Sequence, residues 1–185
     1  MNHFADYFDI FSKILIFNPL NGLKVKIILK NGKMRKRFEQ QMSLGIIPIS
    51  ETPYSIKSRD ATVKLTVAFL EIYNNVDYNE KIFSVLEEYL VNNKQKTGRL
   101  GMDLWQIFVM AQFRVGLDLS YDRLGYLVNG ERTIRTLLGI ETTGFGIERK
   151  EFSYQNIVDN VKLLTDEMLS KINDVIVGFG EKEVF

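Results

Sequence analysis

The stretch "MDLWQIFVMAQFRV" (residues 102–115) carries apolar side chains on nearly every side of a helix, and this pattern decides the fold class. A helix of such composition is stable only when other elements surround it. We therefore expect it to form the buried centre of an all-α helical bundle. Its most buried side chains are expected to be Trp105, Ile107, Phe108 and Met110.

Amphipathic patterns on both sides of this stretch predict further helices. Residues 59–75 and 79–92 place apolar side chains at three- and four-residue steps. Ser153 and Thr165 each precede an apolar-periodic run at a good N-cap position, so each should start a helix. We expect the last of these helices to stop at Gly178.

The chain divides into segments of different regularity. Residues 1–33 form a poorly defined leader, for which we expect partial order at most, with a helix over 4–17. Residues 34–58 combine a basic arm with an extended linker rich in Gly, Pro, Ser and Thr. Residues 59–180 should form the helical domain, and 181–185 a tail.

Composition excludes several kinds of chemistry. The 185 residues include no cysteine and a single histidine, His3, which excludes disulfides and thiolate sites and argues against histidine-based catalysis or metal binding. Asp159, Asp166 and Asp174 fall on expected amphipathic helices, where they are more simply solvated or capping groups than metal ligands. We therefore expect no catalytic residue, no metal site and no cofactor in this chain.

Charge is segregated along the sequence, although the net charge is only +1. Residues 22–37 carry seven Lys or Arg and no acid, whereas 38–93 carry four basic and eight acidic residues. Residues 94–140 are again basic in balance, and 141–185 acidic. Alternating blocks of this kind favour a protein with one side facing a polyanion.

The sequence contains no pattern typical of a membrane span or a secretion signal. The apolar stretch "FDIFSKILIFNPL" (8–20) is interrupted by Asp9 and Lys13 and is too short to cross a bilayer. Asp6 and Asp9 also replace the basic start of a signal peptide. We expect a cytoplasmic protein without a membrane partner.

The stretch "YDRLGYLVNGERTIRTLLGI" (121–140) predicts two short helices at an angle. Ser120 is a sound N-cap for the first helix. Asn129 and Gly130 allow a turn with positive φ, and Gly139 ends the second helix. This arrangement resembles a helix-turn-helix.

The match to a standard helix-turn-helix is partial. Leu124, Val128 and Leu138 fall where buried residues belong, and Gly125 falls where a small residue is needed. Arg135, in contrast, falls on a position that is normally apolar. The pattern alone leaves two interpretations open, a DNA-reading motif and an ordinary corner of a helical core.

Candidate DNA-binding residues come from two places. The open side of the second short helix should offer donors for phosphates and base edges. The basic run "KNGKMRKRFEQQ" (30–41) is either a phosphate-contacting arm or a solvated charged segment. The candidates are Lys33, Arg35, Lys36, Arg37, Arg132, Thr133, Arg135 and Thr136.

An ordered set of five stretches carries a family resemblance. They are "MRKRFEQQMSLGIIPIS" (34–50), "DYNEKIFSVLEE" (77–88), "TGRLGMDLWQIFVMAQFRVGLDLSYDRL" (97–124), "RTLLGIET" (135–142) and "FSYQNIVDNVKLLTDEMLSKINDVIVGFG" (152–180). Together they resemble the N-terminal region of bacterial insertion-sequence transposases of the DDE type. The resemblance implies recognition of terminal inverted repeats in double-stranded DNA. In complete members it also implies DNA cleavage and strand transfer by an RNase H-like core that binds Mg²⁺.

The chain departs from that family at both ends. Residues 1–33 lie outside the resemblance, and after Gly180 the chain reads "EKEVF", where the family continues toward its catalytic core. We therefore expect a truncated transposase product that binds element ends, does no chemistry itself, and self-associates or pairs with intact transposase. The alternatives are a stand-alone helix-turn-helix regulator and a helical interaction module without DNA affinity.

Overall fold

The computed structural model describes residues 36–38, 45–55, 57–90, 102–144 and 147–183, with side chains as far as residue 178. The leader 1–33, with its predicted helix over 4–17, lies outside these ranges. Within them the fold is all-α, and the only β feature is an isolated antiparallel bridge between Ile46 and Thr142. In the same part of the chain, no helix is long and apolar enough to cross a membrane.

The described elements are a short 3-10 helix and seven α-helices. They are the 3-10 helix η1 (Ile49–Glu51) and the α-helices α2 (Ala61–Asn74), α3 (Val76–Leu90), α4 (Leu104–Gly116), α5 (Tyr121–Gly130), α6 (Arg132–Leu137), α7 (Tyr154–Val161) and α8 (Asp166–Glu183).

Side-chain caps fix the starts of several of these helices. Asp103 accepts a hydrogen bond from the Gln106 backbone N–H at 2.7 Å and starts α4. The three predicted N-caps are confirmed, because Ser120, Ser153 and Thr165 each accept from the backbone N–H three residues later. Each such bond satisfies a donor that the helix itself leaves unpaired.

The predicted end of the last helix is wrong. Helix α8 continues through Gly178 to Glu183. Gly178 does not adopt a positive φ, and a glycine inside a helix costs only about 1 kcal/mol relative to alanine. Helix α8 packs along α3, and this tertiary packing offsets a cost of that size.

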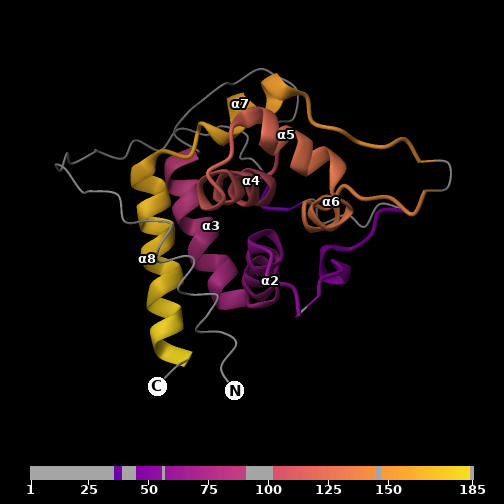
Figure 1. The fold of residues 1–185 in the computed structure, drawn as a ribbon. Coiled ribbons are helices and arrows are strands. Elements are labelled where there is room, and N and C mark those ends of the chain that lie inside the picture. The colour runs from indigo at the N-terminus through magenta and orange to yellow at the C-terminus, as the bar shows by residue number, and fades with distance from the viewer. Residues whose placement is uncertain (1–35, 39–44, 56, 91–101, 145–146, 184–185) are drawn as a thin grey trace.

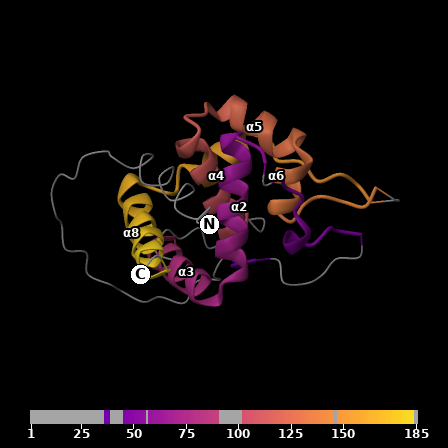
Figure 2. The same cartoon turned by 60° about the horizontal axis from the view of Figure 1, so that its bottom comes forward.

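Helix α4 lies at the centre of the bundle. Figures 1 and 2 show α3 and α8 side by side on one flank, with α2 beneath α4 and α5, α6 and α7 on its other sides. The predicted core residues Trp105, Ile107, Phe108 and Met110 are at most 1% exposed, which confirms the expectation. Burying each of these side chains contributes on the order of 2 kcal/mol, so this helix holds the bundle together.

The linker before α2 is more structured than predicted. Residue 46 pairs with residue 142 across the antiparallel bridge, and the Thr143 N–H donates to the Gly45 carbonyl oxygen at 2.8 Å. Gly45 has φ +83°, and a Cβ atom there would lie 1.8 Å from Cδ1 of Ile147. A short segment before the helical domain is therefore bound to the loop that follows α6.

Candidate nucleic-acid interface

Helices α5 and α6 form the expected corner, which we call the α5–α6 corner (residues 121–139). A single residue in extended conformation, Glu131 (φ −83°, ψ 117°), separates the two helices. Its N–H donates to the Leu127 carbonyl oxygen at 3.0 Å, and its own carbonyl oxygen accepts from the Arg135 N–H at 2.9 Å. The predicted positive-φ turn at Asn129 and Gly130 is wrong, since both residues lie in α5 with ordinary negative φ.

The end of α6 agrees with the sequence. Gly139 has φ +66°, the left-handed conformation that glycine adopts most readily. The Gly139 N–H donates to the Thr136 carbonyl oxygen at 2.9 Å, and the Ile140 N–H donates to the Arg135 carbonyl oxygen at 3.0 Å. These two bonds form a Schellman motif, which closes the helix.

Helix α4 holds α6 in place through two buried polar side chains. Trp105 Nε1 donates to the Leu137 carbonyl oxygen at 2.8 Å, and Gln106 Nε2 donates to the Leu138 carbonyl oxygen at 3.1 Å. These carbonyls belong to the last turn of α6, where no intrahelical partner exists. The α5–α6 corner is thus fixed directly to the centre of the bundle.

Arg132 and Thr133 occupy the first turn of α6. The Arg132 side chain is 73% exposed, and its closest ion-pair contact is 4.0 Å, from Nε to Oε1 of Glu141. Thr133 is half-buried. Of the four candidates on this helix, these two are accessible to a partner.

Arg135 and Thr136 are not on the open side of α6, and this part of the prediction is wrong. Both residues are at most 1% exposed. The Thr136 hydroxyl donates to the Arg132 carbonyl oxygen at 2.9 Å within the helix. Neither side chain can reach DNA without a rearrangement of the core. In the helix-turn-helix pattern, Arg135 falls on a position that is normally apolar and buried. This feature of the sequence could have predicted its burial.

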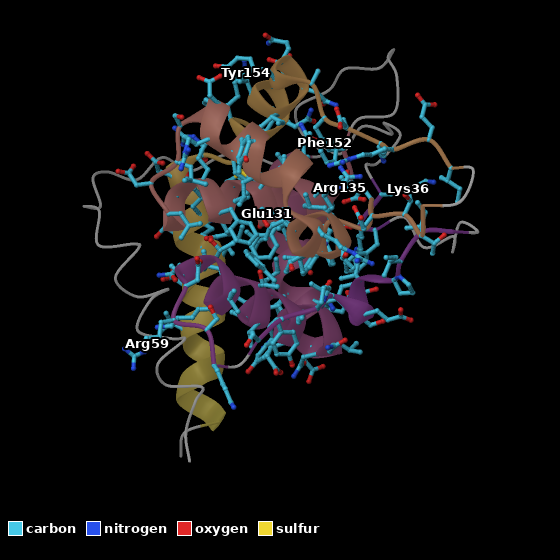
Figure 3. The ribbon with its side chains drawn as sticks, turned by 45° about the vertical axis from the view of Figure 1, so that its right-hand side comes forward. Lys36, Arg59, Glu131, Arg135, Phe152 and Tyr154 are labelled. Carbon is cyan, nitrogen blue, oxygen red and sulfur yellow. The ribbon has the colours of Figure 1, made fainter. Side chains whose placement is uncertain are left out.

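The Arg135 guanidinium has partners on all sides. Its Nε donates to Glu141 Oε2 at 2.5 Å, and its Nη2 donates to the Ile140 carbonyl oxygen at 3.3 Å. Its Nη1 donates to the carbonyl oxygens of Lys150 at 3.0 Å and Asn129 at 3.4 Å. A buried charge is tolerated when paired and hydrogen-bonded in this way. Arg135 therefore ties α6, the end of α5 and the following loop together (Figure 3).

The basic arm is described only at its C-terminal end. Lys33 and Arg35 lie outside the described residues, and Lys36 is exposed. The carbonyl oxygens of Lys36 and Arg37 accept the backbone N–H groups of Leu104 and Trp105 at 2.9 and 3.0 Å, so the arm caps the start of α4.

Arg37 is held by carboxylates rather than presented to a partner. Its Nε donates to Glu87 Oε1 and its Nη1 to Glu80 Oε1, both at 2.6 Å. The hydrogen bonds to Glu87 and Glu80 hold the pKa of Arg37 well above its ordinary value, so the side chain stays charged. Arg37 is therefore a structural anchor on α3, which makes it a poorer phosphate ligand than Lys36.

Phe38 completes this anchor. Its ring meets those of Tyr73 and Phe83 edge-on, with centroids 5.2 and 4.8 Å away, and lies 5.5 Å from the Trp105 ring. Such aromatic pairs add about 0.5–1.5 kcal/mol beyond the area they bury. Nothing in the local sequence pattern marked Phe38 as a packed residue, because its contacts come from distant helices.

The carboxylates named in the sequence do not converge. Asp159 lies on α7, whereas Asp166 and Asp174 lie on α8. Hydrogen bonds from Gln155 and Lys162 lower the pKa of Asp159. In the described part of the chain, no group of three or more His, Cys, Asp or Glu side chains could hold a metal ion.

Asn129 and Arg149 support the α5–α6 corner through contacts that the sequence did not predict. The Asn129 side chain donates from Nδ2 to the Phe152 carbonyl oxygen at 2.8 Å and accepts from the Phe152 N–H at 2.9 Å. Arg149 donates from Nη2 to the Asn129 carbonyl oxygen.

Comparisons of the chain with protein families, with curated proteins and with solved structures found no match.

Proposed function

We propose that this chain binds double-stranded DNA through the α5–α6 corner and the basic arm, as the DNA-binding region of an insertion-sequence transposase. The observation that carries the proposal is Arg132, a 73% exposed arginine in the first turn of the second helix of the corner. In helix-turn-helix proteins the N-terminal residues of the second helix contact base edges. The family resemblance described above supports the same proposal.

The arm adds phosphate contacts to this interface. Its exposed end at Lys36 is joined to the start of α4. The first turn of α4 is joined in turn to the end of α6 through Trp105. The described end of the arm is thus linked through α4 to the α5–α6 corner, where the exposed Lys36 can meet a phosphate. Lys33 and Arg35, which precede it in the sequence, are proposed as further phosphate contacts from their charge alone.

Specificity in this proposal rests on few side chains. Burial of Arg135 and Thr136 leaves Arg132 and Thr133 as the donors on α6. Arginine donates two parallel hydrogen bonds to O6 and N7 of guanine, so Arg132 is the base reader and Thr133 an accessory contact.

A binding titration tests the proposal. The proposal predicts an inverted repeat on either side of the coding gene. The probes are a labelled duplex carrying that repeat and a scrambled duplex of equal length. We expect Arg132→Ala to weaken binding to the repeat by about 1–3 kcal/mol and to reduce the preference over the scrambled duplex. The matched control is Arg59→Ala, an exposed arginine that lies apart from the corner in Figure 3 and should leave binding unchanged.

The burial of half of the α6 candidates favours a second proposal, a helical interaction module without DNA affinity. This module predicts no binding to either duplex, even at low salt. A stand-alone regulator would bind DNA but need not prefer an inverted repeat beside its own gene. The same titration therefore separates all three.

We further propose that the chain cleaves no DNA by itself and acts through occupancy of element ends, through self-association or through pairing with intact transposase. Two-metal phosphoryl transfer requires carboxylates held close enough to share metal ions. Incubation with repeat DNA and Mg²⁺ or Mn²⁺ should leave the DNA intact. Metal-dependent nicks at the element end, lost on changing Asp159, Asp166 or Asp174 to Ala, would overturn this proposal.

A further inference from the structure

The loop after α6 returns to the α5–α6 corner through a segment of residues 147–152. In Figures 1 and 2 the loop first extends away from the helices and then comes back toward α7. Three contacts fix its return. Arg135 Nη1 donates to the Lys150 carbonyl oxygen, the Asn129 amide pairs with both backbone groups of Phe152, and Arg149 donates to the Asn129 carbonyl oxygen.

These contacts gather three arginines around the corner. Arg132 and Arg135 both approach Glu141, from Nε at 4.0 and 2.5 Å. Arg135 and Arg149 both donate to the Asn129 carbonyl oxygen. The Glu141 side chain is only 18% exposed and is already paired with the buried Arg135. The side chains of Arg132 and Arg149 lie outside this buried pair and are 73% and 55% exposed.

Among the residues that the structure describes, one carboxylate competes for Arg149. Its Nε lies 3.5 Å from Glu151 Oε1, and the two side chains are 55% and 60% exposed. An exposed ion pair of this kind contributes about 0–1 kcal/mol, so it exchanges readily for another anion. A phosphate can accept two parallel hydrogen bonds from a guanidinium and carries a stronger charge, whereas the contact with Glu151 is a single ion pair at 3.5 Å.

We propose that Arg149 is a DNA phosphate contact that works together with Arg132, and that Arg135 is the positioning residue that holds the two on one surface. The inference rests on the proposed DNA binding and adds a site to it. Arg132 reads a base, whereas Arg149 contacts the backbone beside it and carries no sequence information. Arg135 itself touches no DNA, because its side chain is 2% exposed.

Phosphate contact at Arg149 has two signatures. Arg149→Ala should weaken binding to the repeat duplex and to the scrambled duplex by the same factor, about five- to tenfold near 0.1 M salt. Glu151→Gln should tighten both by a few-fold, because it removes the carboxylate that competes for the guanidinium. A merely structural role for the 149–151 pair predicts the opposite for Glu151→Gln, namely unchanged or weaker binding.

The matched control is another exposed cation with an acidic partner. Lys162 Nζ lies 3.0 Å from Asp159 Oδ1, with 57% and 49% exposed side chains. Lys162→Ala should leave the affinity for both duplexes unchanged. Circular dichroism and thermal unfolding of each variant establish that the helical fold is kept.

The outcomes separate the inference from the proposed function. Loss of affinity in Arg149→Ala together with a gain in Glu151→Gln supports the inference. If Arg132→Ala weakens binding while Arg149→Ala and Glu151→Gln do not change it, the inference is overturned and the proposed function stands. If the wild-type chain binds neither duplex, both fail.

Discussion

The buried guanidinium of Arg135 joins two segments that are fifteen residues apart, because its Nη1 donates to the Lys150 carbonyl oxygen at 3.0 Å. The same side chain pairs with Glu141 at 2.5 Å and reaches the end of α5 at Asn129. It thereby connects both helices of the corner to the loop that follows them. A residue predicted to read DNA is instead part of the core.

Removing Arg135 should therefore destabilise the fold. We expect Arg135→Ala to lower the free energy of unfolding by about 3 kcal/mol, because it leaves Glu141 and several carbonyl oxygens without their partner. Arg132→Ala, at a 73% exposed position, should change stability by less than about 0.5 kcal/mol. Urea unfolding followed by circular dichroism measures both. Equal stabilities of the two variants would contradict the structural role of Arg135.

The buried position of Arg135 also decides how the α5–α6 corner can be tested. Under the proposed function, substitution at Arg135 should change stability and DNA affinity together. Arg132→Ala alone is therefore the informative variant for base reading.

Two glycines of the corner should respond in opposite ways to alanine. Gly139→Ala should cost about 1–2 kcal/mol, because Gly139 has φ +66° and a Cβ atom strains that conformation. Gly130 lies in α5, and a Cβ atom added there would meet nothing within 4 Å, so Gly130→Ala should be neutral or stabilising by up to about 1 kcal/mol. Thermal unfolding of the pair checks this. A stability loss at Gly130 equal to that at Gly139 would argue against a turn made by Glu131.

Local patterns were enough to predict much of the fold. The caps at Ser120, Ser153 and Thr165 and the stop at Gly139 depend on hydrogen bonds to residues within one helical turn. The burial of α4 follows from its composition alone. Features of this kind depend on residues that are close to one another in the sequence, so a local pattern predicts them.

The candidate site was only partly predictable, because its decisive contacts are long-range. Arg37 is held by Glu80 and Glu87, 43 and 50 residues away. Arg135 is covered by the loop that follows α6, and the periodicity of apolar residues does not predict where that loop runs. Both were assigned to DNA because an isolated sequence shows a charge but not its partner. The sequence pattern did not single out Arg149, because nothing in the neighbouring residues shows that its loop lies beside α5.

Phe38 should stabilise the bundle although it precedes the helical domain. We expect Phe38→Ala to cost about 2–3 kcal/mol, because the ring fills a space between Tyr73, Phe83 and Trp105. The control is Tyr54→Ala at a 48% exposed position, which should cost less than about 1 kcal/mol. Chemical denaturation measures both, and a cost at Phe38 no larger than that at Tyr54 would show that the arm is not anchored.

Alkaline pH should destabilise the fold through Tyr73. Burial raises the pKa of the Tyr73 hydroxyl, so the folded state keeps this proton to a higher pH than the unfolded state. Its contribution to stability is complete below the unfolded pKa of about 10 and is lost as pH rises beyond it. Tyr73→Phe should therefore lose less stability between pH 8 and pH 11 than the wild-type chain. Tyr126→Phe, at a 73% exposed ring, should match the wild type, and a Tyr73→Phe curve parallel to both would contradict the prediction.

The most direct test of DNA binding is the affinity of the wild-type chain for the inverted-repeat duplex across 50–300 mM KCl. Five cations are proposed to contact DNA, namely Lys33, Arg35, Lys36, Arg132 and Arg149. If four of them meet phosphates, a plot of log K against log salt concentration should be a straight line with a slope of about −3.6, since each phosphate contact contributes about −0.9. Absence of binding at 50 mM KCl, or an affinity independent of salt, would contradict the proposed DNA binding.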